Sequence, residues 1–200
     1  MRVRTEARRQ AILETAARAF LELGYERASM SEIAARLGGS KATLYGYFPS
    51  KEDLFVHVVE HIAQIEPVFA ELAQLTDEEP RGVLERMGER FLAAVTSPDA
   101  LAAGRMVIAQ SAQSDNGQPF LDLRAKRTAE LAAYLLATTK AGRLNVKDPP
   151  VAALHLLALF ESDLIWRALL GSRQRFTRAQ IRQAAARAVG VFMAAYGPAK

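Results

Sequence analysis

The chain has 200 residues, of which half are hydrophobic and about a quarter are charged, and its formal net charge is +4. This composition is typical of a globular protein, and the length suits one large domain or a small domain joined to a larger one. Because there is no cysteine, a disulfide framework, a thiolate zinc site and a cysteine nucleophile are excluded.

Neither a secretion signal nor a membrane span is expected. The N-terminal segment "MRVRTEARRQ" is basic, but no apolar run follows it. The longest apolar stretch, "VAALHLLALF" at residues 151–160, is far shorter than the ~20 residues that span a bilayer. We therefore expect a soluble, cytoplasmic protein with no membrane partner.

The basic residues are concentrated in the first quarter of the chain. Residues 1–51 contain nine Lys and Arg against five Glu, whereas the other 149 residues contain 17 charges of each sign. A basic segment on a neutral body is typical of a segment that binds a polyanion such as nucleic acid.

The first two predicted helices lie within the first 40 residues. Apolar residues at a 3.6-residue spacing indicate an amphipathic helix over residues 5–23 that ends at Gly24. Ser29 and Glu32 have the spacing of a capping box and begin a second, short helix. The glycine pair at residues 38–39 ends this helix and predicts a tight turn.

Two more helices follow the turn. Ser40 can cap a third helix over residues 41–48, which Pro49 stops. A fourth helix over residues 50–66 continues until Pro67 interrupts it.

Five further helices are expected in the rest of the chain. Asp148 and Pro149 supply an N-cap and an N1 proline for one of them, and Thr177 with Gln180 forms a capping box for the last. No segment alternates β-branched and polar residues as a strand does. The predicted fold is therefore all-α with about nine helices, the last five covering residues 80–96, 99–111, 119–140, 148–171 and 177–196.

The third helix has an unusual distribution of side chains. Leu44 and Phe48 share one side and must face a core, while Tyr45 and Tyr47 lie on the two flanks. A helix with small outward residues and hydroxyls at its margins can enter the DNA major groove, and the short helix before it completes a helix-turn-helix. Alternatively, the tyrosines are ordinary surface residues and the small strip packs on another helix. The small residues are Ala42, Thr43 and Gly46.

The stretch "ASMSEIAARLGGSKATLYGYFPSKEDLF", residues 28–55, resembles the TetR family of bacterial transcriptional regulators. That family shows a helix-turn-helix followed by an aromatic "LY-x-YF" and a capped "SKE" helix. The resemblance implies a three-helix DNA-binding domain over residues 1–49 and an effector-binding and dimerisation domain over residues 50–200, connected by the helix 50–66. The sequence departs from the family at Gly39, where an apolar residue is usual, and at Gly46, where a larger side chain is common.

The resemblance also implies a set of DNA contacts. We expect Lys41, Ala42 and Thr43 to contact base edges. The residues expected to contact mainly phosphates are Ser29, Ser40, Tyr45, Tyr47 and Lys51. Carried over by position, the expected contacts are Ser29, Ser31, Ser40, Lys41, Ala42, Thr43, Tyr45, Tyr47 and Lys51.

Effector-binding and dimerisation residues are less sharply indicated. Met and aromatic side chains in a helical bundle could line an effector cavity, although each could equally be an ordinary core residue. The candidates of this kind are Met87, Phe91, Met106, Phe120, Phe160 and Trp166. The family resemblance implies an effector cavity between the middle helices that His61 and Ile65 partly reach. The last helices are apolar beyond one face, which a twofold four-helix bundle would cover, although packing within one chain is the alternative. The candidates for that dimer interface are Leu157, Ile181, Ala185, Ala188 and Phe192.

The motif "HVVEH" formally matches a zinc-peptidase spacing and places His57 and His61 on one helix face. Such a site needs a third ligand and a cleft, so zinc hydrolysis and metal sensing remain minor alternatives. His155 is expected to be a hydrogen-bonded core residue. No Ser/His/Asp arrangement or phosphate-binding loop is evident, so we expect no catalysis, no cofactor and no metal.

The sequence therefore predicts a ligand-responsive DNA-binding transcriptional regulator. By the family's usual mode it would be a repressor that binds a pseudo-palindromic operator in double-stranded DNA as a homodimer and leaves it when a small-molecule effector binds. The competing hypotheses are the zinc hydrolase and a helical interaction protein that does not bind DNA.

Overall fold

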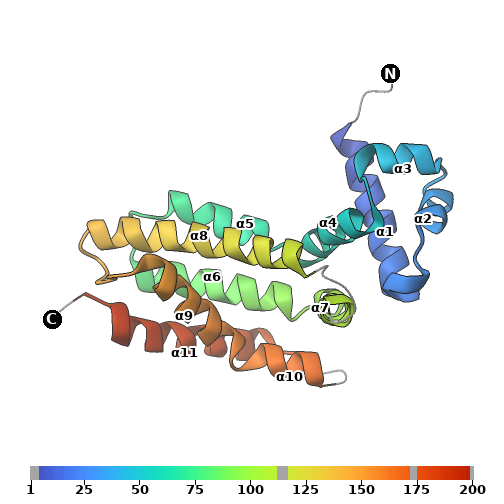
Figure 1. Ribbon diagram of the computed structural model, residues 1–200. Coiled ribbons are helices and arrows are strands. Elements are labelled where there is room, and N and C mark those ends of the chain that lie inside the picture. The colour runs from blue at the N-terminus through green and yellow to red at the C-terminus, as the bar shows by residue number, and fades with distance from the viewer. Residues whose placement is uncertain (1–4, 112–116, 172–174, 199–200) are drawn as a thin grey trace. The chain divides into compact units, whose positions relative to one another are not determined.

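The computed structural model describes residues 5–111, 117–171 and 175–198. In these ranges the chain is all-helical, as predicted, with eleven α-helices and one short 3-10 helix (Figure 1). The expected number of about nine helices is close to this. The helices are α1 Glu6–Arg27, α2 Met30–Arg36, α3 Lys41–Tyr47, α4 Lys51–Ala63, α5 Glu66–Ala70, η1 Glu71–Gln74, α6 Pro80–Val95, α7 Pro98–Ser111, α8 Gln118–Lys140, α9 Pro149–Glu161, α10 Leu164–Leu170 and α11 Arg178–Tyr196.

The predicted caps begin their helices. In each case a side-chain oxygen accepts a hydrogen bond from a backbone N–H of the first turn, which would otherwise have no partner. Both halves of a capping box form at Thr177 and Gln180. At the second helix the Glu32 carboxylate instead accepts a hydrogen bond from Arg36 Nε at 2.8 Å. The capping residues are Ser29, Ser40, Ser50, Asp148 and Thr177.

Gly24 ends the regular part of α1, as the sequence predicts. Its φ of 75° and ψ of 167° interrupt the helix, and one further turn continues to Arg27. Only glycine adopts this φ at little cost.

The predicted helix 50–66 is too long, because α4 ends at Ala63. A proline ring clashes with the carbonyl four residues before it, and Ala63 is the residue four before Pro67. The following residue, Gln64, has a φ of 47°, and α5 begins at Glu66.

The single helix predicted over residues 148–171 is in fact two helices, α9 and α10. The break follows Glu161, where Ser162 Oγ donates to the Leu159 carbonyl at 2.8 Å. Serine and aspartate side chains compete with helical backbone hydrogen bonds, and Asp163 also forms ion pairs with Arg167 and Arg187.

The chain forms two compact units. The first comprises Met1–Ala63 with Asp99–Phe120, and the second comprises Gln64–Pro98 with Leu121–Lys200. By packing, α4 therefore belongs with the N-terminal helices. The functional division at residue 49 expected from the sequence stays a prediction.

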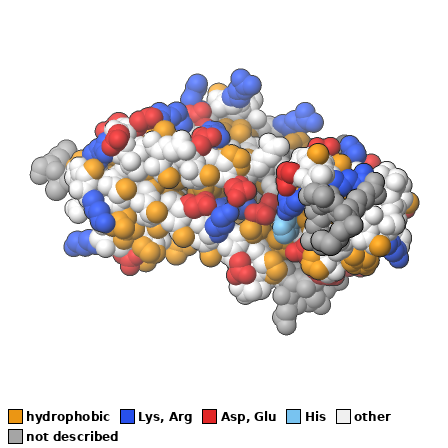
Figure 2. All heavy atoms as spheres, turned by 90° about the horizontal axis from the view of Figure 1, so that it is seen from above, with side chains coloured by type: hydrophobic (Ala, Val, Ile, Leu, Met, Phe, Trp, Pro, Cys, Tyr) orange, Lys and Arg blue, Asp and Glu red, His pale blue; other side chains and the backbone are white. Residues whose placement is uncertain are grey.

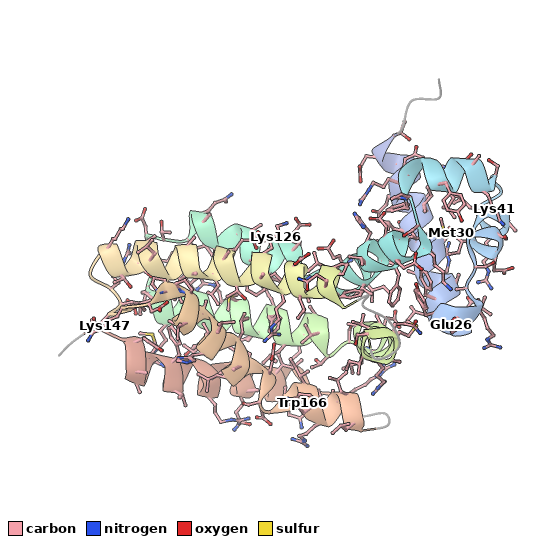
Figure 3. The ribbon with its side chains drawn as sticks, viewed as in Figure 1. Glu26, Met30, Lys41, Lys126, Lys147 and Trp166 are labelled. Carbon is pink, nitrogen blue, oxygen red and sulfur yellow. The ribbon has the colours of Figure 1, made fainter. Side chains whose placement is uncertain are left out.

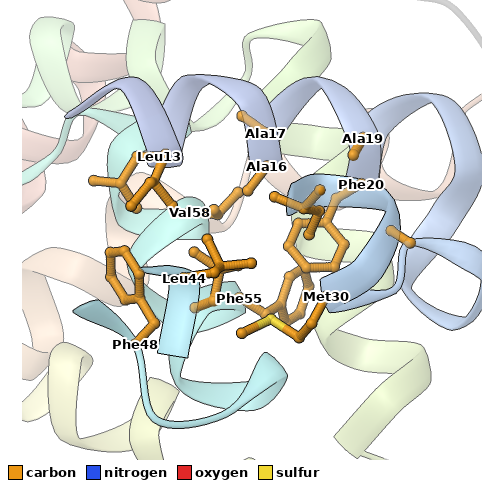
Figure 4. Close-up of a cluster of buried hydrophobic side chains, with 14 of the residues drawn as sticks. Leu13, Ala16, Ala17, Ala19, Phe20, Met30, Leu44, Phe48, Phe55 and Val58 are labelled. Atoms are coloured by element: carbon orange, nitrogen blue, oxygen red, sulfur yellow. The ribbon is translucent and has the colours of Figure 1, made fainter. Parts of the chain in front are cut away.

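The core of the first unit joins α1 to α2, α3 and α4. Phe20, Leu44, Phe48 and Phe55 meet there with small side chains of α1 (Figure 4). The Phe20 and Phe55 rings cross edge to face at 5.0 Å between centroids. This packing fixes the orientation of α3, since Leu44 is wholly buried.

The core of the second unit is built where α11 packs against α6 and α9. Gly88 of α6 lies so close to Phe160 that a Cβ at this glycine would stand 2.3 Å from Phe160 Cε1 and 3.2 Å from Ala185 Cβ. Phe91 continues the cluster, with its ring 6.2 Å from that of Phe160.

On the face shown in Figure 2, acidic and basic side chains are intermixed. In the second unit, Lys126 Nζ lies 2.9 Å from the Glu66 carboxylate, and Arg124 pairs with Glu161. Exposed pairs of this kind add at most about 1 kcal/mol to stability. Among the described helices, none is both long and apolar enough to cross a membrane alone, and only α6 and α7 taken together as a bent pair reach that length and composition.

Candidate nucleic-acid interface

The buried side of α3 determines which residues it presents outward. Leu44 and Phe48 are 0% and 1% exposed, as the helical spacing predicts. Lys41, Ala42 and Tyr45 are therefore exposed, and Lys41 projects from the first turn of α3 (Figure 3). The outward face of α3 thus combines a cation, a small side chain and a phenol.

Further hydroxyl groups lie at the start of α2 and at the N-cap of α3. Ser29, Ser31 and Ser40 are all exposed. Ser40 Oγ accepts from the Thr43 N–H at 3.1 Å and lies 3.0 Å from Thr43 Oγ1, so each of these two hydroxyls already has a partner.

The two tyrosines of α3 have different surroundings. Tyr45 is 48% exposed, and no hydrogen bond joins its hydroxyl to any described residue. Tyr47 is half-buried, and its hydroxyl oxygen accepts from the Thr5 N–H at 3.1 Å. The Tyr47 hydroxyl can still donate its own hydrogen to a phosphate.

Lys51 is held by groups of its own chain. Its Nζ donates to the Glu26 carbonyl at 3.2 Å and lies 4.2 Å from the centroid of the Tyr25 ring. Burial lowers the pKa of Lys51. The Tyr25 hydroxyl donates to Glu52 at 3.2 Å, and burial, followed by the nearby Glu52 carboxylate, raises the pKa of Tyr25 to about 12.

Not every basic residue near this surface is available to a ligand. Arg36 pairs with both Glu22 and Glu32, at 2.6 and 2.8 Å, so its charge is largely compensated. Arg9 lies 5.4 Å above the Phe48 ring, where a guanidinium interacts favourably with the aromatic face.

Sequence reasoning missed the parts that α1 and its end contribute. Tyr25 packs beside Lys51, and Arg8 reaches the turn at Gly39, where a Cβ would lie 3.1 Å from its Nη2. Neither contact has a signal in residue spacing, because each joins segments more than 25 residues apart. The excess of basic residues before position 10 was the one available hint.

The residues expected to bind an effector do not form one group. Met87, Phe91, Phe160 and Ile65 are all buried in the second unit, where the Phe91 and Phe160 rings lie near each other. The other four lie elsewhere. His61 belongs to the first unit, Met106 and Phe120 pack against its core, and Trp166 of α10 is 59% exposed (Figure 3).

Phe120 lines a small cavity in the first unit. Its walls include Tyr25, Glu52 and Phe55, and its volume is ≈ 30 Å³. A space of this size holds about one water molecule, so this cavity does not suit an organic effector.

The residues expected at a dimer interface require a correction. Leu157, Ala185, Ala188 and Phe192 are 0–5% exposed within the chain, because α9 and α11 use that side to pack against each other and α6. Of the five residues, only Ile181 is partly exposed. The apolar residues that α9 and α11 expose include Val151, Leu154, Ala158, Ala186, Val191 and Ala194.

Two of the three histidines, His57 and His155, are each engaged in a hydrogen bond and a ring contact. His57 Nδ1 lies 3.0 Å from the Asp53 carbonyl, and its ring meets Phe48 edge to face. His155 is exposed rather than in the core, and its Nδ1 is 2.6 Å from the Tyr196 hydroxyl. Within the described ranges, no three His, Asp or Glu side chains converge as metal ligands would.

Comparison with known proteins agrees with this helix-turn-helix surface. Residues 12–58 match the family described as bacterial regulatory proteins, tetR family, and residues 82–198 match the AefR-like transcriptional repressor C-terminal domain. Among individual relatives, 59 residues (30% of this chain) are 41% identical to the HTH-type transcriptional activator FasR of Mycolicibacterium smegmatis. Another match, of 65 residues (32% of this chain), is 40% identical to the HTH-type transcriptional repressor AcnR of Corynebacterium diphtheriae. The matches span only 27% and 34% of those two proteins.

Solved structures agree over nearly the whole chain. A TetR-family regulator from Mesorhizobium loti MAFF303099 superposes with a TM-score of 0.85 at 27% identity, covering 98% of this chain and 100% of that one. The flavonoid-responsive regulator FrrA superposes with a TM-score of 0.68 at 26% identity, with coverage of 98% and 100%. The two family matches together cover most of the sequence, and the helix-turn-helix lies inside the first of them. The chain therefore belongs to the TetR family of DNA-binding bacterial transcriptional regulators.

Proposed function

We propose that this regulator is a homodimeric repressor, rather than an enzyme, that works in the cytoplasm and leaves a pseudo-palindromic operator when a small molecule binds. The observation that carries the DNA-binding part is the outward face of α3. Leu44 and Phe48 anchor the helix, while Lys41, Ala42 and Tyr45 are exposed.

In the proposed complex, α3 lies in the major groove. Lys41, Ala42 and the Thr43 methyl meet base edges, and hydroxyls around them meet phosphates. Ser29, Ser31, Ser40, Tyr45 and Tyr47 supply those hydroxyls. Lys51 adds a cation once its ammonium turns from the Glu26 carbonyl toward a phosphate. Residues 1–49 thus form the DNA-binding domain, and residues 50–200 serve effector binding and dimerisation.

The decisive experiment selects binding sites from random duplex DNA with the purified protein. The enriched sequence is then tested with the double variant Tyr45→Ala/Lys51→Ala, which we expect not to bind it. Tyr45→Ala alone is the cleaner probe, because its hydroxyl has no partner within the described part of the chain. Lys147→Ala serves as the control, since Lys147 is an exposed lysine of the second unit. Full affinity in the double variant would contradict the proposed surface.

The dimer is proposed to form through the exposed sides of α9 and α11. Val151, Leu154 and Ala158 recur at helical spacing on α9, and an unpaired apolar stripe is stabilised by a second copy. On α11, Ala186 and Ala194 flank Gly190, where a Cβ would have nothing within 4 Å. Such small residues permit close approach of two helices across a twofold axis.

Replacing Leu154 or Gly190 by Arg should produce a monomer in light scattering coupled to size exclusion. Leu136→Arg, an exposed leucine on α8 of the same unit, is the control and should leave the dimer intact. A dimer that survives both substitutions would place the interface elsewhere. In the proposed dimer, the two recognition helices would lie ~34 Å apart, which would explain a palindromic operator.

The effector is proposed to enter the aromatic core of the second unit. Phe91 lies 5.9 Å from Phe69 and 6.2 Å from Phe160, and FrrA, with the same fold, is a flavonoid-responsive regulator. Release requires the ligand to favour the DNA-incompetent state by about 1–3 kcal/mol or more. A screen for compounds that raise the melting temperature and release operator DNA tests this, and Phe160→Leu should abolish both effects together.

A further inference from the structure

The turn between α2 and α3 contains two adjacent glycines with different roles. Gly38 has a φ of +65°, and its N–H donates to the Ala35 carbonyl at 3.1 Å, while the Gly39 N–H donates to the Ala34 carbonyl at 3.0 Å. This pair of bonds is the Schellman motif that closes a helix. The backbone therefore requires glycine at position 38.

Position 39 has no such backbone requirement. Its φ is outside the left-handed region, and in a Schellman motif an apolar side chain commonly stands here and packs back on the helix. A Cβ at Gly39 would lie 3.1 Å from Nη2 of Arg8 and 3.9 Å from Leu37. Gly39 thus leaves open the space beside which the Arg8 guanidinium lies.

Two hydrogen bonds hold the backbone at the start of α1, from which the Arg8 side chain extends. Thr5 Oγ1 accepts from the Arg8 N–H at 3.3 Å, and the Thr5 N–H donates to the Tyr47 hydroxyl at 3.1 Å. The first turn of α1 is thereby tied to the last turn of α3. The Arg8 side chain extends from the first turn of α1 along α3. Its guanidinium lies beside Gly39, in the loop that precedes α3.

The Arg8 charge is not compensated by the described part of the chain. Its guanidinium makes no hydrogen bond or ion pair there, in contrast to Arg36 with its two carboxylates. Arg8 is half-buried, so its stem is packed. Next to Gly39, the exposed residues Ser40 and Lys41 begin α3.

We propose that Arg8 binds a DNA phosphate beside the turn of the helix-turn-helix, and that glycine at position 39 admits it. The proposal rests on the proposed placement of α3 in the major groove. An uncompensated guanidinium at the edge of that helix has the chemistry of a phosphate ligand, because its planar donors match phosphate oxygens. Arg8 then adds affinity and orientation without reading a base.

The test measures operator affinity of the full chain as a function of salt. Each phosphate contact contributes about 0.9 to the slope of log K against log salt concentration, so Arg8→Ala should reduce the slope by about one. The same slope corresponds to about eightfold weaker binding at 0.1 M salt. Arg8→Lys should recover most of the slope. Arg18→Ala, an exposed arginine about 15 Å further along α1, is the control and should bind like the wild type.

A second variant tests the role of the glycine. Gly39→Leu should weaken binding as much as Arg8→Ala, and the double variant should be no weaker than either, because both remove one interaction. Far-UV circular dichroism verifies that each variant is folded. Additive losses in the double variant would overturn the link between the two residues.

The results separate this inference from the proposed function. If the wild type binds a selected operator but Arg8→Ala has the slope of Arg18→Ala, Arg8 is not a phosphate ligand and the inference fails alone. If the wild type enriches no DNA sequence and shows no salt-dependent binding, the proposed function and this inference fail together.

Discussion

The Tyr47 hydroxyl at the end of α3 accepts a hydrogen bond from the backbone N–H of Thr5, 42 residues earlier in the chain. Thr5 is also the N-cap of α1. One phenol therefore connects the start of the first helix to the helix proposed to read DNA. A residue expected only to meet phosphate has a second task in the folded protein.

The Tyr47→Phe variant should loosen the first turn of α1. We expect faster hydrogen exchange at the amides of Thr5 and its neighbours, with the free energy of unfolding lowered by no more than about 1 kcal/mol, because one exposed hydrogen bond is lost. Mass-spectrometric hydrogen exchange measures this. Tyr45→Phe is the matched control, and equal exchange in both variants would argue against the role of Tyr47.

The Tyr25 phenol provides a direct test of the group of residues around Lys51. Burial is the larger cause that raises its pKa to about 12, and the Glu52 carboxylate is the second. Glu52→Gln removes the charge but not the burial, so the pKa of Tyr25 should fall while staying above 10. Ultraviolet titration of tyrosinate ionisation follows this, and Asp53→Asn is a neighbouring control. An unchanged titration would mean that Glu52 has no influence on the phenol.

Two buried phenols predict how stability changes in alkali. Burial also raises the pKa of Tyr134 to about 12, so between pH 10 and 12 the folded protein holds phenolic protons that the unfolded chain has released. The free energy of unfolding should therefore fall as pH rises through this window and be unaffected by these groups below it. Urea unfolding at a series of pH values measures the slope.

Tyr134 is also the better site for a stabilising substitution. Its hydroxyl is buried without a hydrogen-bond partner among the described residues, which costs free energy. Tyr134→Phe should raise the free energy of unfolding by up to about 1 kcal/mol and weaken its decline above pH 10. Tyr25→Phe, which loses a bond to Glu52, should have the opposite effect at neutral pH. Destabilisation by Tyr134→Phe would indicate a buried water bound to the hydroxyl.

Gly88 should be among the least tolerant positions of the second unit. Alanine there would place its Cβ 2.3 Å from Phe160 Cε1, and overpacking of this kind costs about 1–3 kcal/mol. The usual gain of about 0.5–1 kcal/mol from replacing a helical glycine does not offset it. Gly82→Ala on the same helix meets only Arg86 Nη1 at 3.5 Å and should not destabilise. Urea unfolding of both variants provides the comparison.

Much of the fold could be predicted because local chemistry determines it. Capping residues such as Ser29, Ser40 and Thr177 mark where helices begin, and the helical spacing of Leu44 and Phe48 marks the buried side of α3. The break between α9 and α10 was missed because the apolar pattern runs through it. Only the side-chain bond of Ser162 and the ion pairs of Asp163 distinguish it from a continuous helix.

The expected site residues also divide into those determined by local sequence and those determined by the packing of separate helices. Exposure of Lys41 and Tyr45 follows from periodicity within one short helix, whereas the partners of Lys51 and Arg8 depend on how separate helices pack. Four of the five expected dimer residues, all except Ile181, are buried within the chain for the same reason. A small apolar helix face such as that of Ala185 and Ala188 suits packing within the chain as well as packing between chains.

The contact of Gly88 with Phe160 and Ala185 has a consequence for how the sequence can evolve. Because three helices meet at one point with no spare volume, the three positions cannot vary independently. A lineage that acquires a side chain at position 88 must first, or at the same time, accept a smaller residue opposite it. In an alignment of homologues, substitutions at these three positions should therefore covary, with their summed side-chain volume nearly constant.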